Sequence, residues 1–325
     1  MAENTLQEQL QKYLTDAHSI EVQALAQMRS APGIAGDPQL AEIFRAHERE
    51  TEEHKRLVEA RLEAHGASPN KLKDIAGQLT GKGFVLFAKF NPDTPGKLAA
   101  HAHSYEAMEE AAYELLYRVA ERAGDSETGD VARTILEQEK AMKGRIFDNF
   151  DRAVEASLRD KNADDMEEEL VKYLADAHAI EGQAIQMLES APKIVEEPRL
   201  AKLFEDHLEE TRAQQEIIKA RLDAHGGSPN KLQDAAMRLG ALNWGGFFKA
   251  QPDSPAKLAG FNYAFEHLEI AAYEELKRVA ERAGDQETVR VAERIEGEER
   301  AAANAIAANW ELALQASLES VGAVA

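Results

Sequence analysis

Apolar residues recur at steps of three or four along most of the chain, which is the period of an α-helix with one buried face. This pattern predicts four long helices in the first half of the sequence, over about residues 5–28, 38–65, 94–123 and 126–158. A proline or glycine follows each of the first three predicted ends, as is typical of helix boundaries. A short helical insertion is expected between the second and third helices, where SPNKL and GFVLFAKF occur. Four such helices typically pack as a four-helix bundle.

The pattern then repeats. When the sequence is shifted by 160 residues, QKYLTDAHSIEVQA from Gln11 aligns with VKYLADAHAIEGQA from Val171, and the match continues without a gap to the end of the copy. The chain is therefore interpreted as two copies of one domain, residues 1–160 and 161–325, joined by the polar stretch RDKNADD. The predicted fold is all-α, with two tandem four-helix bundles.

Several acidic residues and histidines fall on the lines that should face the interior. Glu21 interrupts the apolar line of the first helix, and Glu139 that of the fourth. In the second helix the line Leu40, Ile43, His47, Glu50, His54, Leu57 carries three polar residues. In the third, Glu106 and Glu109 border the apolar line and are the two residues of 101–110 that copy two retains.

Burying an uncompensated carboxylate costs several kcal/mol even after relaxation, so a set of inward acids must be protonated, paired or bound to metal. No Lys or Arg lies on these lines, which favours metal, and two divalent cations would neutralise four carboxylates. Oxygen and nitrogen ligands suit iron, manganese or zinc. The absence of cysteine excludes thiolate sites. The candidate ligands are Glu21, His47, Glu50, His54, Glu106, Glu109 and Glu139 in copy one, and Glu181, His207, Glu210, Glu266, Glu269 and Glu299 in copy two.

Each of these residues has an ordinary alternative interpretation when taken alone. A single Glu in an Ala- and Glu-rich helix usually faces solvent, and His47 or His207 alone suits a hydrogen-bonded core histidine equally well. Their coincidence on four helices, repeated in both copies, favours the metal site. His18 and His178 are expected to support the site or lie at the surface. Tyr113 and Tyr273 either pack in the core, which is the favoured interpretation, or hydrogen-bond a ligand. Copy two has Gln214 in place of His54, so copy one is expected to be the better-ligated site.

Charge narrows the possible partners. The 325 residues include 59 Asp and Glu against 38 Lys and Arg, a formal net charge of −21. Such a chain repels phosphate backbones and anionic membrane surfaces, so neither nucleic acid nor a membrane is an expected partner. No apolar run approaches the roughly 18 residues that a membrane span needs, and the opening MAENTLQEQLQKY does not resemble a signal peptide. A cytoplasmic location is expected.

The motifs YLTDAHSIEVQAL, FRAHERETEEH, YEAMEEAAY and LEQEK, with FEDHLEETR and FEHLEIAAY in copy two, resemble helix signatures of the ferritin-like superfamily. Within that superfamily, the sequence resembles the YciE/YciF-type ferritin-like family, a bacterial stress-associated group. It implies ferritin-like bundles with two iron or manganese ions per lobe, and a role in metal handling or oxidative-stress defence through Fe(II) oxidation or peroxide and dioxygen chemistry. The superfamily's usual Glu-x-x-His is absent; His47-x-x-Glu50 and His207-x-x-Glu210 stand instead.

Two other functions stay open at this stage. One is a non-enzymatic helical scaffold or partner-binding protein with protonated inward acids; the other is a zinc- or iron-binding protein without turnover. The fusion of two lobes is expected to reproduce within one chain a pseudo-dimer of single-domain relatives, with further oligomerisation left open.

Overall fold

The structure, a computed structural model, describes residues 5–67, 94–229 and 254–323. Within these ranges all regular secondary structure is helical and no strand occurs, as the periodicity predicts. The chain divides into two compact units, and we call the part up to Arg159 the first unit and Asp160–Ser320 the second unit. The insertions expected between the second and third helices lie outside the described residues.

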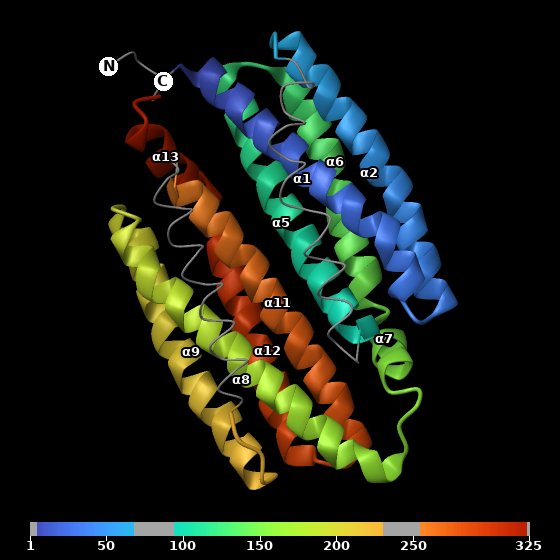
Figure 1. Cartoon of the computed structure of the whole chain (residues 1–325). Coiled ribbons are helices and arrows are strands. Elements are labelled where there is room, and N and C mark those ends of the chain that lie inside the picture. Colours follow the sequence, from blue (N-terminus) through green and yellow to red (C-terminus); the bar gives the residue numbers. More distant parts are fainter. Residues whose placement is uncertain (1–4, 68–93, 230–253, 324–325) are drawn as a thin grey trace. The chain divides into compact units, whose positions relative to one another are not determined.

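The described residues of the first unit form α1 (Leu6–Ile34), α2 (Pro38–Ala64), α5 (Thr94–Ala123), α6 (Ser126–Phe147) and α7 (Phe150–Ser157) (Figure 1). The second unit contains α8 (Met166–Ser190), α9 (Pro198–Ala224), α11 (Ser254–Ala283), α12 (Gln286–Ala307) and α13 (Trp310–Ser320), with short 3-10 turns η1 (Ala163–Asp165) and η2 (Ala191–Lys193). In each unit, four long helices therefore supply the bundle.

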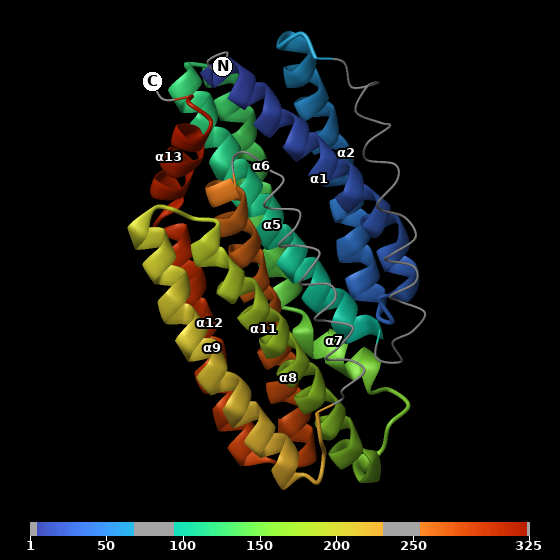
Figure 2. The same ribbon diagram turned by 60° about the vertical axis from the view of Figure 1, so that its left-hand side comes forward.

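The packing inside the first unit brings the four helices around one core. α1 packs against α2 and α5, and α6 packs against α5 and α2, while the short α7 covers part of α5. The second unit repeats these contacts with α8, α9, α11, α12 and α13, as the turned view in Figure 2 also shows. Short connections at 35–37 and 124–125 make α1 antiparallel to α2 and α5 antiparallel to α6.

Local sequence explains where several helices begin and end. Thr5 and Glu8 form a reciprocal capping box at the start of α1, and the Asp37 side chain accepts hydrogen bonds from two backbone N–H groups at the start of α2. Gly66 (φ 74°) and Gly124 (φ 72°) follow α2 and α5 in the left-handed region that glycine adopts without strain. The predicted ends of these two helices are confirmed.

Two predicted boundaries are wrong. α1 continues through Pro32 to Ile34, because the proline falls in the last turn, where its missing N–H removes only one of the final hydrogen bonds. The predicted fourth helix is broken into α6 and α7 at Asp148 and Asn149, where the Asn149 amide donates to the carbonyl of Arg145 at 2.8 Å. The break redirects the chain, and the first residue of α7, Phe150, is buried.

Among the described residues, none of the helices combines the length and the apolar character that crossing a bilayer requires.

Candidate metal centre

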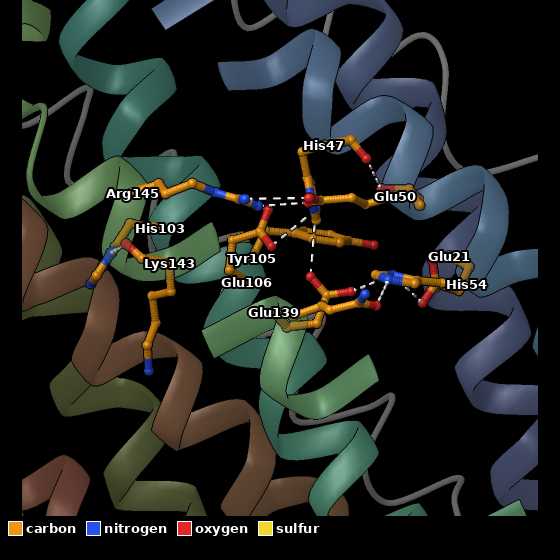
Figure 3. A network of polar contacts seen from close by, with 12 residues as sticks. Glu21, His47, Glu50, His54, His103, Tyr105, Glu106, Glu139, Lys143 and Arg145 are labelled. Carbon is orange, nitrogen blue, oxygen red and sulfur yellow. Dashed lines mark hydrogen bonds and ion pairs between the residues drawn. The ribbon is translucent and has the colours of Figure 1, made fainter. Parts of the chain in front are cut away.

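The core of the first unit contains two overlapping groups of buried carboxylates and imidazoles. One group is His47, Glu106, Glu109 and Glu139, and the other is Glu21, His54 and Glu139. Within each group, every residue offers a ligand atom, and these atoms lie within 4.8 Å of one another. The residues come from α1, α2, α5 and α6, and Glu139 belongs to both groups (Figure 3).

The helical period explains how α1, α5 and α6 place their acids. Glu21 on α1 and Glu139 on α6 are fully buried, as their apolar lines predict. On α5, Glu106 and Glu109 are also fully buried, and their three-residue spacing places both on one side of the helix. The interior positions predicted for these four acids are confirmed.

The line predicted for α2 is wrong. The buried residues of this helix follow Leu40, Phe44, His47, Thr51, His54, Val58 and Leu62. Both histidines belong to this line, but Glu50 lies beside it with 30% of its side chain exposed. Glu50 is in neither of the two groups. α2 is polar on most of its surface, so two neighbouring lines of residues had similar apolar content, and the sequence pattern favoured the wrong one.

Glu50 instead holds His47 from the outside. Its Oε2 lies 3.0 Å from His47 Nδ1, and the Arg145 guanidinium donates to both Glu50 oxygens at 2.6 and 3.2 Å. Burial opposes ionisation of Glu50, yet these bonds from His47 and Arg145 lower its pKa to about 2. With Nδ1–H donated to Glu50, the other ring nitrogen of His47 faces the carboxylates, the arrangement that orients metal-binding histidines.

His54 is fixed in the same way by a different partner. Its Nε2 lies 2.7 Å from the side-chain oxygen of Gln138, which requires the proton to be on Nε2. Its Nδ1 then points inward, 2.8 Å from Glu139 Oε1 and 3.8 Å from Glu21 Oε1. His47 Nε2 lies 3.1 Å from Glu106 Oε2 and 3.5 Å from Glu139 Oε2. Both imidazoles thus direct one nitrogen at Glu139.

In the metal-free centre, burial and the closeness of the acids to one another shift their pKa values. Burial and the charge of Glu139 raise the pKa of Glu21 to about 8, and burial raises that of Glu106 to about 7 against the opposing charge of His47. Burial and neighbouring acids raise the pKa of Glu109 well above its usual range. Burial also acts against ionised Glu139, but the hydrogen bond from His54 and the two imidazole charges lower its pKa. Without cations, the centre therefore retains protons.

A buried carboxylate without a hydrogen-bond partner also indicates that these residues fit divalent cations. In the described part of the chain, neither carboxylate oxygen of Glu109 has a hydrogen-bond partner, although the side chain is fully buried. Buried polar atoms are normally paired, and such an orphaned carboxylate in a protein core is well explained by an ion. Glu21 is paired, because the Tyr113 hydroxyl donates a hydrogen bond to its Oε1. Tyr113 is buried as expected, and it also positions an acid of the centre.

The second unit repeats one of the two groups. His207, Glu266, Glu269 and Glu299 offer ligand atoms within 4.8 Å of one another, and His207 Nε2 lies 2.9 Å from Glu266 Oε2 and 3.5 Å from Glu299 Oε2. Glu181 is buried outside this group and accepts a hydrogen bond from Tyr273.

Among the predicted ligands of the second unit, Glu210 lies furthest from the interior position expected of it. Its side chain is 62% exposed, and its Oε2 lies 3.5 Å from His207 Nδ1. The residue equivalent to Arg145 is Ala305, which has no charge to hold Glu210. The predicted interior position of Glu210 is therefore wrong, as it is for Glu50.

Other histidines lie apart from the two groups. His18 is buried, and its Nε2 lies 3.1 Å from Glu59. His65, just after α2, pairs with Asp125 at 2.7 Å, and His225 pairs with Asp285 at the same distance in the second unit. Sequence reasoning missed Gln138 and Arg145. Gln138 adjoins the buried Glu139, and a weak signal for Arg145 was its replacement by Ala305 in the other copy.

A profile of the family named "Domain of unknown function (DUF892)" matches residues 5–159 and again residues 165–319. The chain belongs to the DUF892 family. Because the two matches cover nearly all of the sequence, the tandem duplication is confirmed, and each match spans one bundle with one set of buried acids. No solved structure matches the chain.

Proposed function

We propose that this DUF892 protein is a ferritin-like, dimetal-carboxylate protein that binds iron or manganese in the cytoplasm and acts in metal handling or oxidative-stress defence. The observation that carries the proposal is the position of Glu139, which belongs to both groups of buried ligand atoms in the first unit. A carboxylate with one oxygen near each of two imidazoles suits a ligand shared by two ions.

The charges of the first unit support two ions. His47, Glu106, Glu109 and Glu139 would hold one cation, and Glu21, His54 and Glu139 the other. The four carboxylates of the two groups carry the charge that two divalent cations neutralise. Oxygen donors with one imidazole for each ion suit iron and manganese, and they also accept zinc.

A pair of iron or manganese ions would supply redox chemistry with dioxygen or peroxide, as the resemblance to the YciE/YciF-type ferritin-like family implies. The chain's own residues suit that chemistry. Tyr113 holds Glu21 by a hydrogen bond, and Glu50 and Gln138 hold the outer nitrogens of the two histidines. The acids are fully buried and lie away from bulk water, so the charges of bound ions and carboxylates would act strongly on one another.

The test is to load the full chain anaerobically with Fe(II), measure bound iron, and then add dioxygen or hydrogen peroxide. We expect bound Fe(II) to be oxidised and peroxide to be consumed, and we expect Glu139→Ala to lose both activities together with the iron. Bound metal without oxidation or peroxide consumption would favour a zinc- or iron-binding protein without turnover. Less than one metal per unit, with Mn(II) as well as Fe(II), would favour a helical scaffold whose inward acids are protonated.

A further inference from the structure

The two units differ at a hydrogen-bonded pair of residues beside the ligand groups, of which His54 in the first unit and Gln214 in the second are buried. In the first unit His54 contacts Gln138, and in the second unit the equivalent residues are Gln214 and Glu298. Both members of the pair have changed, so that an imidazole donating to an amide oxygen is replaced by an amide donating to a carboxylate. The hydrogen bond between α2 and α6 is thus kept between α9 and α12, while the imidazole is lost.

The replacement is firmly held. Gln214 is buried, and its Nε2 donates to Glu298 Oε2 at 3.1 Å. The other oxygen of Glu298 accepts from Arg294 Nε at 2.8 Å. Glu298 therefore has two donors of its own and is held by Arg294 on the outer side of the helix. The amide nitrogen that it fixes carries no lone pair for a metal ion, so Gln214 offers only its buried amide oxygen, which is uncharged and a poorer ligand than the imidazole for iron or manganese.

The ligand groups reflect this change. In the described part of the second unit, His207, Glu266, Glu269 and Glu299 form a group, but no group of histidines and acids corresponds to Glu21, His54 and Glu139, because the imidazole of the first unit is replaced by an uncharged amide. Glu269 is buried, and neither of its carboxylate oxygens has a hydrogen-bond partner among the described residues. An unpartnered acid directed into the remaining group indicates that this position still takes a cation.

We propose that the second unit binds a single divalent cation, at His207, Glu266, Glu269 and Glu299, whereas the first unit binds two. This inference rests on the proposed function and deepens it. A single ion has no neighbouring ion with which to share the electrons of a two-electron reaction. Turnover that needs a pair of ions is therefore confined to the first unit, and the second unit holds a single resident ion.

The chain offers matched variants in which each unit takes the pair of the other. The double variant Gln214→His with Glu298→Gln places the first unit's pair in the second unit. The reciprocal variant, His54→Gln with Gln138→Glu, places the second unit's pair in the first. The full chain and both variants are loaded with Mn(II) under anaerobic conditions, freed of excess metal, and counted by native mass spectrometry. Electron paramagnetic resonance then separates exchange-coupled Mn(II) pairs from isolated Mn(II).

We expect three ions in the unaltered chain, with the spectra of both a coupled pair and an isolated ion. The Gln214→His, Glu298→Gln variant should bind four ions and lose the isolated-ion spectrum. The reciprocal variant should bind two ions and lose the coupled-pair spectrum. Circular dichroism checks that each variant is folded, and the two variants test the proposal independently if one of them fails to fold.

Four ions in the unaltered chain, or two coupled pairs, would overturn the single-ion inference and leave the proposed function intact. Two isolated ions, or a pair in the first unit with an empty second unit, would also overturn the inference. No bound ion in the unaltered chain would overturn the proposed function itself. Unchanged ion counts in both folded variants would show that the His54 position does not decide the difference.

Discussion

The two units share the buried acids and the histidine of the centre, and they differ in the residues that surround these groups. Both bury four glutamates and one histidine at equivalent positions, which in the first unit are Glu21, His47, Glu106, Glu109 and Glu139. Glu50 and Glu210 are the acids that lie outside. They differ where His54, Gln138 and Arg145 are replaced by Gln214, Glu298 and Ala305. The ligand positions have therefore been retained while the residues that orient or extend them have changed.

The difference alters the electrostatics of the shared acid. In the first unit, hydrogen bonding and charge from His54 help to lower the pKa of Glu139 despite its burial. In the second unit, burial and the charges of Glu266 and Glu181 raise the pKa of the equivalent Glu299 well above its usual range. The His54 imidazole is thus one of the groups that hold Glu139 as an anion, and the second unit has no imidazole at the equivalent position beside Glu299.

The largest difference is expected when this acid is removed from each unit. Glu139→Gln removes a member of both groups in the first unit, so we expect both of its ions to be lost. Glu299→Gln removes a member of the one group in the second unit, and we expect the loss of one ion. Native mass spectrometry of the two Mn(II)-loaded variants measures the difference. Equal losses from both variants would contradict the shared role of Glu139.

A second effect concerns stability without metal and should be alike in the two units. Burial raises the pKa of Glu21 and of Glu181 to about 8 from 4.5. An acid that binds its proton more tightly when folded stabilises the protein fully below the unfolded pKa, and this stabilisation is lost as the pH rises through the folded pKa. The free energy of unfolding of the metal-free protein should therefore fall by on the order of a few kcal/mol between pH 5 and pH 8.5.

Thermal melts at both pH values measure this change. Glu21→Gln and Glu181→Gln should each reduce the dependence on pH, because glutamine does not ionise. Bound Mn(II) should reverse it, since cations replace the protons. A metal-free protein that is as stable at pH 8.5 as at pH 5 would contradict the crowded acids described for both units.

A smaller asymmetry is expected at the outer acids. Glu50→Gln should weaken Mn(II) binding to the first unit by roughly 10- to 100-fold, the usual cost of losing a carboxylate that orients a metal-binding histidine. Glu210→Gln should change binding to the second unit little, because Glu210 is exposed and lies 3.5 Å from His207. Competition titration with a chelator measures both. If the two variants weaken binding equally, the contact between Glu50 and His47 has no special role.

The smallest difference between the units is expected at the polar cluster near the ends of α2 and α9. Asp125 accepts from His65 at 2.7 Å and Asp285 from His225 at 2.7 Å, each with an arginine and a threonine as further partners. Asp125→Asn and Asp285→Asn should each lower the free energy of unfolding by about 1.5–3 kcal/mol, the range for hydrogen bonds to charged groups. Urea unfolding of the metal-free variants should give similar losses, and a clear inequality would show that the clusters are not equivalent.

Much of this arrangement follows from sequence periodicity. On α1 and α6, a single acid interrupts an otherwise apolar line, so Glu21 and Glu139 can be assigned to the interior from spacing alone. α2 has polar residues on most of its surface. The line predicted to be buried was therefore shifted by one position and contained Glu50, whereas the line that is buried contains Thr51. A short window of a 3.6-residue period does not separate such lines.

The remaining features depend on contacts between helices. Gln138 and Arg145 lie on α6 but act on histidines of α2, and no spacing within one helix reveals such a partner. The break between α6 and α7 likewise depends on the burial of Phe150, with Asn149 bonded to the preceding turn. Comparison of the two copies was the better guide, because it marked Glu106 and Glu109 as retained.

The most direct test of the central claim is a crystal structure of the Mn(II)-loaded protein, with anomalous diffraction data recorded at the manganese absorption edge. We predict two anomalous peaks in the first unit, one beside His47 and one beside His54 with Glu139 between them, and one peak in the second unit beside His207. Peaks confined to exposed acids, with none among the buried glutamates, would contradict the metal centre.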